Sequence, residues 1–148
     1  MKKGLIVLCV VTISLITVGS VFRIKHRQWN TELEPLTGFF PVFSEAEDCC
    51  WKEGNYNTMF SVPGPSSAWI KGYLKFPDTT FNQLYQNYSW TQVESQPYQI
   101  ESCSDYPVDD TQWLLSQKLS TEIMMPKFVG WVYLNEQHNI VYFYAEFA

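Results

Sequence analysis

Three short hydrophobic runs stand out along the chain, each bounded by polar or turn-forming residues. Residues 128–134 and 140–147 are rich in aromatic and β-branched side chains, and the polar stretch 135–139 between them has the composition of a hairpin loop. Residues 69–76 share this composition and predict a third strand. Gly72 inside that strand indicates a bulge or the close approach of another backbone.

A helical pattern follows the run at 69–76. Four hydrophobic residues recur at intervals of three and four and therefore share one helical face: Phe81, Leu84, Tyr85 and Tyr88. Asp78 lies just before them and is suited to cap the helix. Residues 90–94 predict a short strand after it.

A second helix is predicted to begin at the capping residues Asp109 and Asp110 and to end at Leu119. The inward-facing residues of this helix are expected to be Trp113, Leu114 and Gln117. The polar segment 95–108, which holds two prolines, predicts a loop before it.

These elements predict a small α+β domain at residues 44–148, with an antiparallel sheet of four or five strands and two helices packed on one face. Residues 44–48 have a composition found at helix starts, and the Pro-, Gly- and Ser-rich stretch 61–67 predicts a break in regular structure. Residues 28–43 show no sustained hydrophobic period and contain Pro35, Gly38 and Pro41. They are predicted to form a tether.

The N-terminal part has a different pattern. Residues 4–22 form 19 consecutive uncharged positions, which as a helix would cover about 28 Å, close to the hydrocarbon thickness of a bilayer. Residues 1–27 are therefore predicted to be a signal-anchor with basic flanks, and residues 4–22 the contact with the membrane. A cleaved secretory signal is the alternative, with 18–20 as its small-residue cleavage site. Cys9 is not preceded by the small residue usual in a lipidated signal and is expected to be an apolar residue in the membrane.

Charge separates the two parts of the chain. Residues 1–27 carry five basic residues and no acid, whereas fifteen acids face five lysines from residue 28 onward, a balance of −10. Such an acidic body argues against nucleic acid as a partner. The basic residues on both sides of the apolar run nearly cancel in the positive-inside rule. We expect a single-pass protein of the cell membrane whose C-terminal domain is exported, periplasmic or extracellular; the opposite orientation would leave it in the cytoplasm.

Three cysteines follow the apolar run: Cys49, Cys50 and Cys103. In an oxidising compartment one disulfide is expected. Adjacent cysteines rarely bridge each other, so Cys103 is predicted to pair with Cys49 or Cys50. No C-x-x-C spacing indicates a metal site, and neither a metal nor a cofactor is expected.

Candidates for catalysis are few, and no catalytic residue is predicted. The histidines are His26, at the membrane edge, and His138, in the predicted hairpin loop; neither accompanies a recognised nucleophile or metal motif. A carbohydrate- or peptide-acting enzyme would need paired acids across a cleft, for which the loop carboxylates are the candidates: Glu94, Glu101, Asp105, Asp109 and Asp110. Asp109 and Asp110 are better explained as helix caps.

Aromatic residues provide the candidate binding surface. Trp131 and Tyr133 share one face of their strand, and Tyr142 and Tyr144 share one face of the next. Tyrosine and tryptophan are enriched at recognition surfaces, so this hairpin is a possible binding surface unless other elements cover it. No set of residues marks a known family. We expect a membrane-anchored protein of the cell envelope that binds another protein, for example as an immunity protein or an inhibitor does. An envelope enzyme and a structural accessory subunit of a membrane complex are the alternatives.

Overall fold

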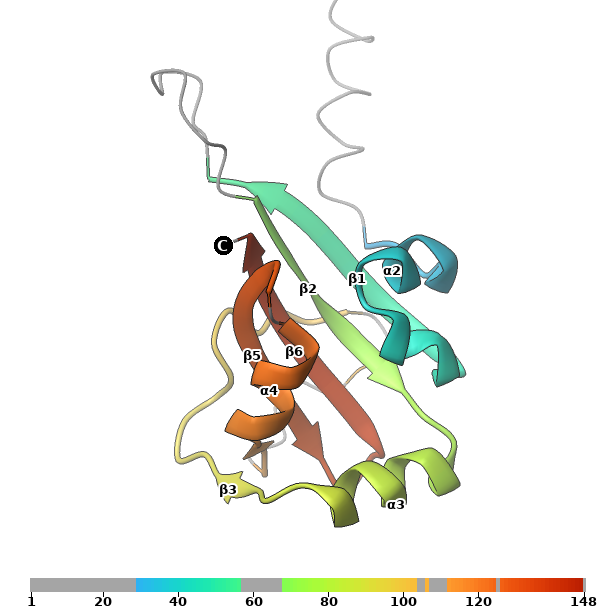
Figure 1. The fold of residues 1–148 in the computed structure, drawn as a ribbon, viewed down its shortest axis with the longest axis vertical. Helices are drawn as coiled ribbons and strands as arrows, with labels where there is room; N and C mark the ends of the chain where they lie inside the picture. Colours follow the sequence, from blue (N-terminus) through green and yellow to red (C-terminus); the bar gives the residue numbers. More distant parts are fainter. Residues whose placement is uncertain (1–28, 57–67, 104–105, 107–111, 125, 148) are drawn as a thin grey trace, which may run out of the picture.

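The computed structural model describes residues 29–147 except 57–67, 104–105, 107–111 and 125 (Figure 1). The predicted membrane segment, the break at 61–67, His26, Cys9 and the acids Asp105, Asp109 and Asp110 lie outside these residues. Among the helices described, none has both the length and the apolar composition to cross a bilayer.

The domain is α+β and is built on one six-stranded antiparallel sheet with the strand order β1-β2-β6-β5-β4-β3. The strands are β1 Asp48–Asn55, β2 Ala68–Lys75, β3 Thr91–Gln92, β4 Leu114–Leu115, β5 Phe128–Asn135 and β6 Ile140–Phe147. The predicted hairpin of β5 and β6, the strand at β2 and the short strand at β3 are confirmed. The sheet has more strands than the four or five expected, because β1 and β4 join its two sides.

Helical segments cover one face of this sheet. They are α2 Leu33–Phe39, the 3-10 helix η1 Pro41–Glu45, α3 Asp78–Asn87 and α4 Gln117–Met124. Figure 1 shows α2 and α4 in front of the sheet and α3 across its lower end. Buried side chains from all four segments pack on inward residues of the central strands, among them Val132, Phe143 and Leu74. The helices thus lie on one face, as expected, but the described part of the domain has three α-helices where two were predicted.

The structure differs from the predicted tether at 28–43. From residue 33 onward this segment forms α2 and η1, and Leu36, Phe40 and Phe43 are buried against the sheet. These three residues follow the helical spacing of four and three, and Pro41 lies at the start of η1, where a missing backbone N–H costs nothing. The helix-start composition at 44–48 likewise leads into η1 and β1 rather than into a new helix.

The predicted helix from Asp109 to Leu119 is wrong, because α4 begins only at Gln117 and residues 114–115 form β4. Ser116 acts as the N-cap, since its Oγ accepts a hydrogen bond from Leu119 N at 3.3 Å. Trp113 is buried as expected, but Gln117 is exposed. Residues 114–115 are not helical because their backbone pairs with the edge of β5.

At Gly72 and Gly130 the neighbouring strand lies so close that no side chain would fit. A Cβ on Gly72 would lie 2.5 Å from Trp51 Cβ, and one on Gly130 would lie 2.0 Å from the carbonyl oxygen of Tyr144. The prediction that another backbone approaches Gly72 is confirmed, since β1 lies directly against it.

Candidate functional site

The face of the sheet opposite the helices carries two rows of side chains in register. Across β1, β2, β6 and β5 the first row is Lys52, Lys71, Tyr144 and Trp131, and the second is Cys50, Tyr73, Tyr142 and Tyr133. The residues of one row lie two positions from those of the next along each strand, so all eight side chains emerge on the same face.

The segment of residues 93–103, here called the strap, covers much of this face. The disulfide between Cys50 and Cys103 attaches one end of it to β1. Tyr73 Oη donates to the carbonyl of Glu101 at 2.7 Å, and Tyr142 Oη donates to the carbonyl of Tyr98 at 3.1 Å. The strap is therefore fixed by covalent and polar contacts rather than by a strand of its own.

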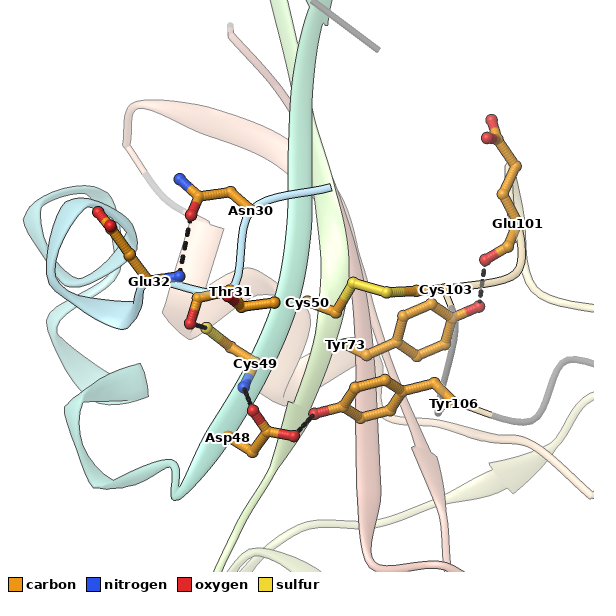
Figure 2. Close-up of a disulfide and its surroundings, with 10 residues drawn as sticks. All are labelled: Asn30, Thr31, Glu32, Asp48, Cys49, Cys50, Tyr73, Glu101, Cys103 and Tyr106. Atoms are coloured by element: carbon orange, nitrogen blue, oxygen red, sulfur yellow. Dashed lines mark hydrogen bonds between the residues drawn. A yellow bond between two sulfur atoms is a disulfide. The ribbon is translucent and has the colours of Figure 1, made fainter. Parts of the chain in front are cut away.

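Figure 2 shows the disulfide and its surroundings. Cys49 and Cys50 are neighbours on β1 and project to opposite sides of the sheet, so only Cys50 can reach the strap. Cys49 is a buried free thiol that donates to the carbonyl of Thr31 at 3.3 Å. Burial, with Asp48 beside it, raises the pKa of the Cys49 thiol to about 11. Of the two partners the sequence left open for Cys103, Cys50 is confirmed.

Lys71 lies at the centre of the strap's contacts and is 2% exposed. Its Nζ donates to Glu101 Oε1 at 2.5 Å and to the carbonyl of Gln99 at 2.8 Å, and it lies 5.0 Å from the centre of the Trp69 ring. The second carboxylate oxygen of Glu101 pairs with Lys52. The carboxylate of Glu101 thus pairs with both Lys52 and Lys71. The buried ammonium of Lys71 therefore has its counter-charge within the domain.

The ionisation of this cluster follows from burial and pairing. Burial lowers the pKa of Lys71, and the hydrogen bond and charge of Glu101 partly offset that effect. Burial by itself would raise the pKa of Glu101, but the hydrogen bonds and charges of Lys52 and Lys71 together bring it below its ordinary value. Glu101 is therefore ionised at neutral pH.

Gln99 gives the strap its shape at this point. Its φ is 56°, a left-handed conformation that a residue with a side chain adopts at a cost. The turn is closed by Ile100 N, which donates to the carbonyl of Pro97 at 3.2 Å. This turn places the Gln99 carbonyl on the ammonium of Lys71.

Of the four residues predicted as a possible binding surface, three are buried and one is exposed. Tyr133, Tyr142 and Tyr144 are buried, whereas Trp131 is 38% exposed. The three tyrosines are removed from solvent because the strap and residues near Trp113 pack over them. Of the predicted surface, only Trp131 remains open to a partner.

Trp131 belongs to a different exposed cluster, which we call the aromatic patch: Tyr56, Tyr98, Val129 and Trp131. Their exposed fractions are 46% for Tyr56, 46% for Tyr98 and 57% for Val129. The rings of Tyr98 and Trp131 have centroids 5.3 Å apart, and Trp131 stacks on Tyr144 at 6.1 Å. Sequence reasoning missed Tyr98 because it lies in a polar loop; the alternation of Val129 with Trp131 could have indicated Val129.

The loop carboxylates considered for catalysis are not brought together within the described residues. Glu101 is paired with two lysines, and Glu94 is exposed just after β3. A cavity of about 160 Å³ lies between η1, α3, α4 and the sheet and has one carboxylate, Glu45, in its lining. Another, of about 340 Å³, lies beside β3 and β4 and has Glu136 in its lining. Glycoside hydrolysis requires two acids that face each other across a cleft, whereas each of these two cavities has a single carboxylate in its lining.

His138 lies exposed in the hairpin loop, as expected, where its backbone N donates to Asn135 Oδ1 at 3.2 Å. Within the part of the chain that the structure describes, no three His, Cys, Asp or Glu side chains are grouped as a metal site.

Comparisons with known proteins give no relative for this chain: no protein-family model, no curated protein and no solved structure matches it.

Proposed function

We propose that this chain is a single-pass membrane protein whose exported domain binds another protein at the cell envelope, in the manner of an immunity protein or inhibitor. The observation that carries the proposal is the aromatic patch. Tyr98, Val129 and Trp131 are large or branched apolar residues that remain between 38% and 57% exposed on one end of the sheet.

The composition of the patch supports a protein partner. Tryptophan and tyrosine dominate the residues that contribute most to binding energy at protein interfaces. Both side chains are amphipathic, so they tolerate water when free and bury a large area when bound. Trp131 and Tyr98 meet this description, since both are partly exposed and their rings are in contact.

The rigidity of the patch supports the same function. Tyr98 belongs to the strap, and its neighbours in the strap are fixed by Lys71 and by the Cys50–Cys103 disulfide. Trp131 lies on β5, where it pairs with Tyr144 of the central strand β6. A surface that is ordered before binding loses less conformational entropy when the partner arrives.

Charge and redox chemistry favour the proposed setting. The balance of −10 from residue 28 onward favours a basic partner and steers its approach. A structural disulfide is typical of exported domains. A membrane anchor would raise the local concentration of the domain, so that modest affinity is sufficient.

Site-specific photo-cross-linking tests this function. A photoreactive phenylalanine analogue is placed at Trp131, and in a separate variant at Tyr85. Tyr85 is a matched control because it is also aromatic and 37% exposed but lies on α3, away from the patch. After irradiation of cells that express the full chain, we expect one discrete adduct at position 131 and none at position 85.

The adduct should shrink several-fold when Tyr98→Ala is added, since this change removes part of the patch. A position-131 variant that forms no adduct, or forms the same adducts as the position-85 variant, would overturn the proposal.

A further inference from the structure

Glu146 lies beside the aromatic patch and forms no ion pair with any lysine of the described residues. On β6 it pairs directly with Val129 of β5, while Tyr144 pairs with Trp131. Glu146 and Trp131 are therefore diagonal neighbours on one face of the sheet, a relation that usually spans about 7–8 Å between Cα atoms. The patch thus combines aromatic rings and one carboxylate on the same surface.

Two tyrosine hydroxyls fix the carboxylate of Glu146. Tyr56 Oη donates to Glu146 Oε1 at 2.8 Å, and Tyr144 Oη donates to the same oxygen at 2.5 Å. Among the described residues, Oε2 accepts no hydrogen bond, and no lysine lies within 4.0 Å of either oxygen. The carboxylate is therefore oriented by two neutral donors, and no lysine of the described residues pairs with its charge.

The lysines nearest in the sheet are already engaged. Lys52 and Lys71 both pair with Glu101, and their ammonium groups lie near the rings of Trp29 and Trp69. Their contacts show how this face of the sheet accommodates a cation: each ammonium has the carboxylate of Glu101 and at least one indole ring beside it. Glu146 and Trp131 repeat that pair of groups at the exposed end of the face.

The indole of Trp131 has two ring neighbours and is still partly exposed. Trp131 has one side stacked on Tyr144 with 28° between the ring planes, and Tyr98 meets it with centroids 5.3 Å apart. The 38% exposure of Trp131 leaves part of its indole open to solvent. A guanidinium is planar, stacks on indole and presents a fork of donors that fits a carboxylate, whereas an ammonium is a strongly hydrated point charge.

A purely apolar occupant fits this surface less well. It would bury Glu146 Oε2 without a partner, and burying an unpaired charge is strongly unfavourable. A cation removes that cost while keeping the contact with the rings. The acidic balance of the domain acts in the same direction.

We infer that the aromatic patch receives an arginine side chain of the partner protein, stacked on Trp131 and Tyr98 and paired with the free oxygen of Glu146. The inference rests on the proposed function, because it names the chemistry of the residue that the partner inserts.

The test uses the full chain in detergent micelles, labelled with 5-fluorotryptophan and observed by ¹⁹F NMR, with Trp131→Phe used to assign the resonance. The probes are the peptide acetyl-Ala-Leu-Arg-Leu-Ala-amide and its citrulline analogue, which has nearly the same shape and no charge. We expect the arginine peptide to shift the Trp131 resonance with a dissociation constant in the millimolar range or tighter, and the citrulline peptide to bind at least 10-fold more weakly.

Variants separate the specific carboxylate from the general acidity of the domain. Glu146→Gln should weaken the arginine peptide about 10-fold, and Glu146→Asp, which keeps the charge, should recover part of this loss. Glu94→Gln removes an exposed acid that is not in the patch and should change the affinity less than twofold.

Equal binding of the two peptides, or equal effects of Glu146→Gln and Glu94→Gln, would overturn the inference. If the cross-link at position 131 forms but neither peptide moves the Trp131 resonance, the arginine site is overturned while the protein-binding function stands. If the arginine peptide binds as expected and no cross-link forms, the chemistry of the site is supported and the proposed function is overturned.

Discussion

At the scale of single residues, Lys71 is a charged side chain that is almost fully buried. Its side chain is 2% exposed, yet its ammonium has a carboxylate, a carbonyl and an indole ring as neighbours. A buried cation is tolerated only when such partners replace its lost water. Because two of these partners, Gln99 and Glu101, belong to the strap, the buried ammonium of Lys71 also holds the strap against the sheet.

Lys71→Met tests this role, since methionine keeps most of the apolar stem and removes the ammonium. The carbonyl of Gln99 then loses its donor, and we expect the free energy of unfolding to fall by about 1–3 kcal/mol. Urea unfolding of the full chain in detergent measures the change. Lys75→Met is the control because Lys75 is exposed at the end of the same strand, and it should shift stability by less than about 0.5 kcal/mol. A neutral or stabilising Lys71→Met would mean that desolvation of the ammonium outweighs its bonds.

Glu101 makes stability depend on pH. Its pKa is lower in the folded state than in the unfolded chain, where a glutamate titrates near about 4.3. The unfolded state therefore binds the proton first as the pH falls, so the contribution of Glu101 is fully present above about pH 5 and is lost as the pH falls through its folded pKa. We expect the free energy of unfolding to fall less steeply between pH 5 and pH 3 in Glu101→Gln than in the native chain. Parallel curves, measured by urea unfolding at each pH, would contradict this.

At the scale of elements, the strap replaces a strand on the tyrosine face. Only its first residue continues the β-sheet pairing, since Val93 N donates to the carbonyl of Trp113 at 2.9 Å. Its other attachments are the Cys50–Cys103 disulfide and side-chain hydrogen bonds from Lys71, Tyr73 and Tyr142. On the opposite face α4 is attached through Ser120, whose Oγ accepts from Val132 N at 2.8 Å and donates to the carbonyl of Ser116 at 2.7 Å. Helices cover one face of the sheet through apolar packing, whereas a loop covers part of the other through specific bonds.

Removing the disulfide should therefore affect the strap first. The two cysteines are 53 residues apart, and on the chain-entropy model the Cys50→Ala/Cys103→Ala variant loses about 4 kcal/mol of stability. Limited proteolysis should also cut within residues 93–103 in this variant before it cuts elsewhere. Cys49→Ala is the matched control because it removes a neighbouring buried thiol and keeps the bridge. Equal losses of stability in the two variants, measured by urea unfolding, would assign the effect to β1 rather than to the strap.

At the scale of the whole molecule, one sheet separates two cores of different chemistry. The helical face is filled mainly by aliphatic and phenylalanine side chains, together with Trp51 and Cys49, and the strap face mainly by tyrosines, Trp113 and the disulfide. Tyrosine hydroxyls need partners when buried, and the strap supplies backbone carbonyls for them. The polar face is also the one that carries the patch and Glu146, so the proposed contact with a partner is continuous with the more polar of the two cores.

Export of the domain is testable through an introduced cysteine, because the native ones react poorly. Cys49 is buried with a pKa raised to about 11, and Cys50 and Cys103 form the disulfide. Lys118→Cys is placed on α4, where the side chain at this position is 69% exposed, with Cys9 and Cys49 replaced by alanine. If the domain is exported, a membrane-impermeant maleimide should label this variant in intact cells. Labelling that appears only after lysis would place the domain in the cytoplasm. Permeabilised cells expressing the same variant give the full-label reference.

The pattern of the sequence was sufficient for the elements whose own side chains decide their structure. The β5–β6 hairpin, β2 and α3 each carry their period in their own residues, and the acidic balance and the pairing of Cys103 with one of two neighbours follow from composition and geometry. Alternation also placed Trp131 with Tyr133, and Tyr142 with Tyr144, on one face of each strand, and the register of the hairpin brings the two pairs onto the same face of the sheet. Local periodicity is a property of the segment alone, so it can be read before the fold is known.

Tertiary contacts decided the rest. β1 and β4 have weak strand patterns and exist because β2 and β5 offer them unpaired edges. Residues 33–45 are folded because Leu36, Phe40 and Phe43 pack against the sheet. The ring of Tyr98 in the strap contacts both Tyr144, which is buried, and Trp131, which stays 38% exposed. The candidate site is formed by residues from β5, β6, the end of β1 and a loop. Their proximity depends on strand order and on a bridge between residues 50 and 103, and no segment of the sequence contains that information by itself.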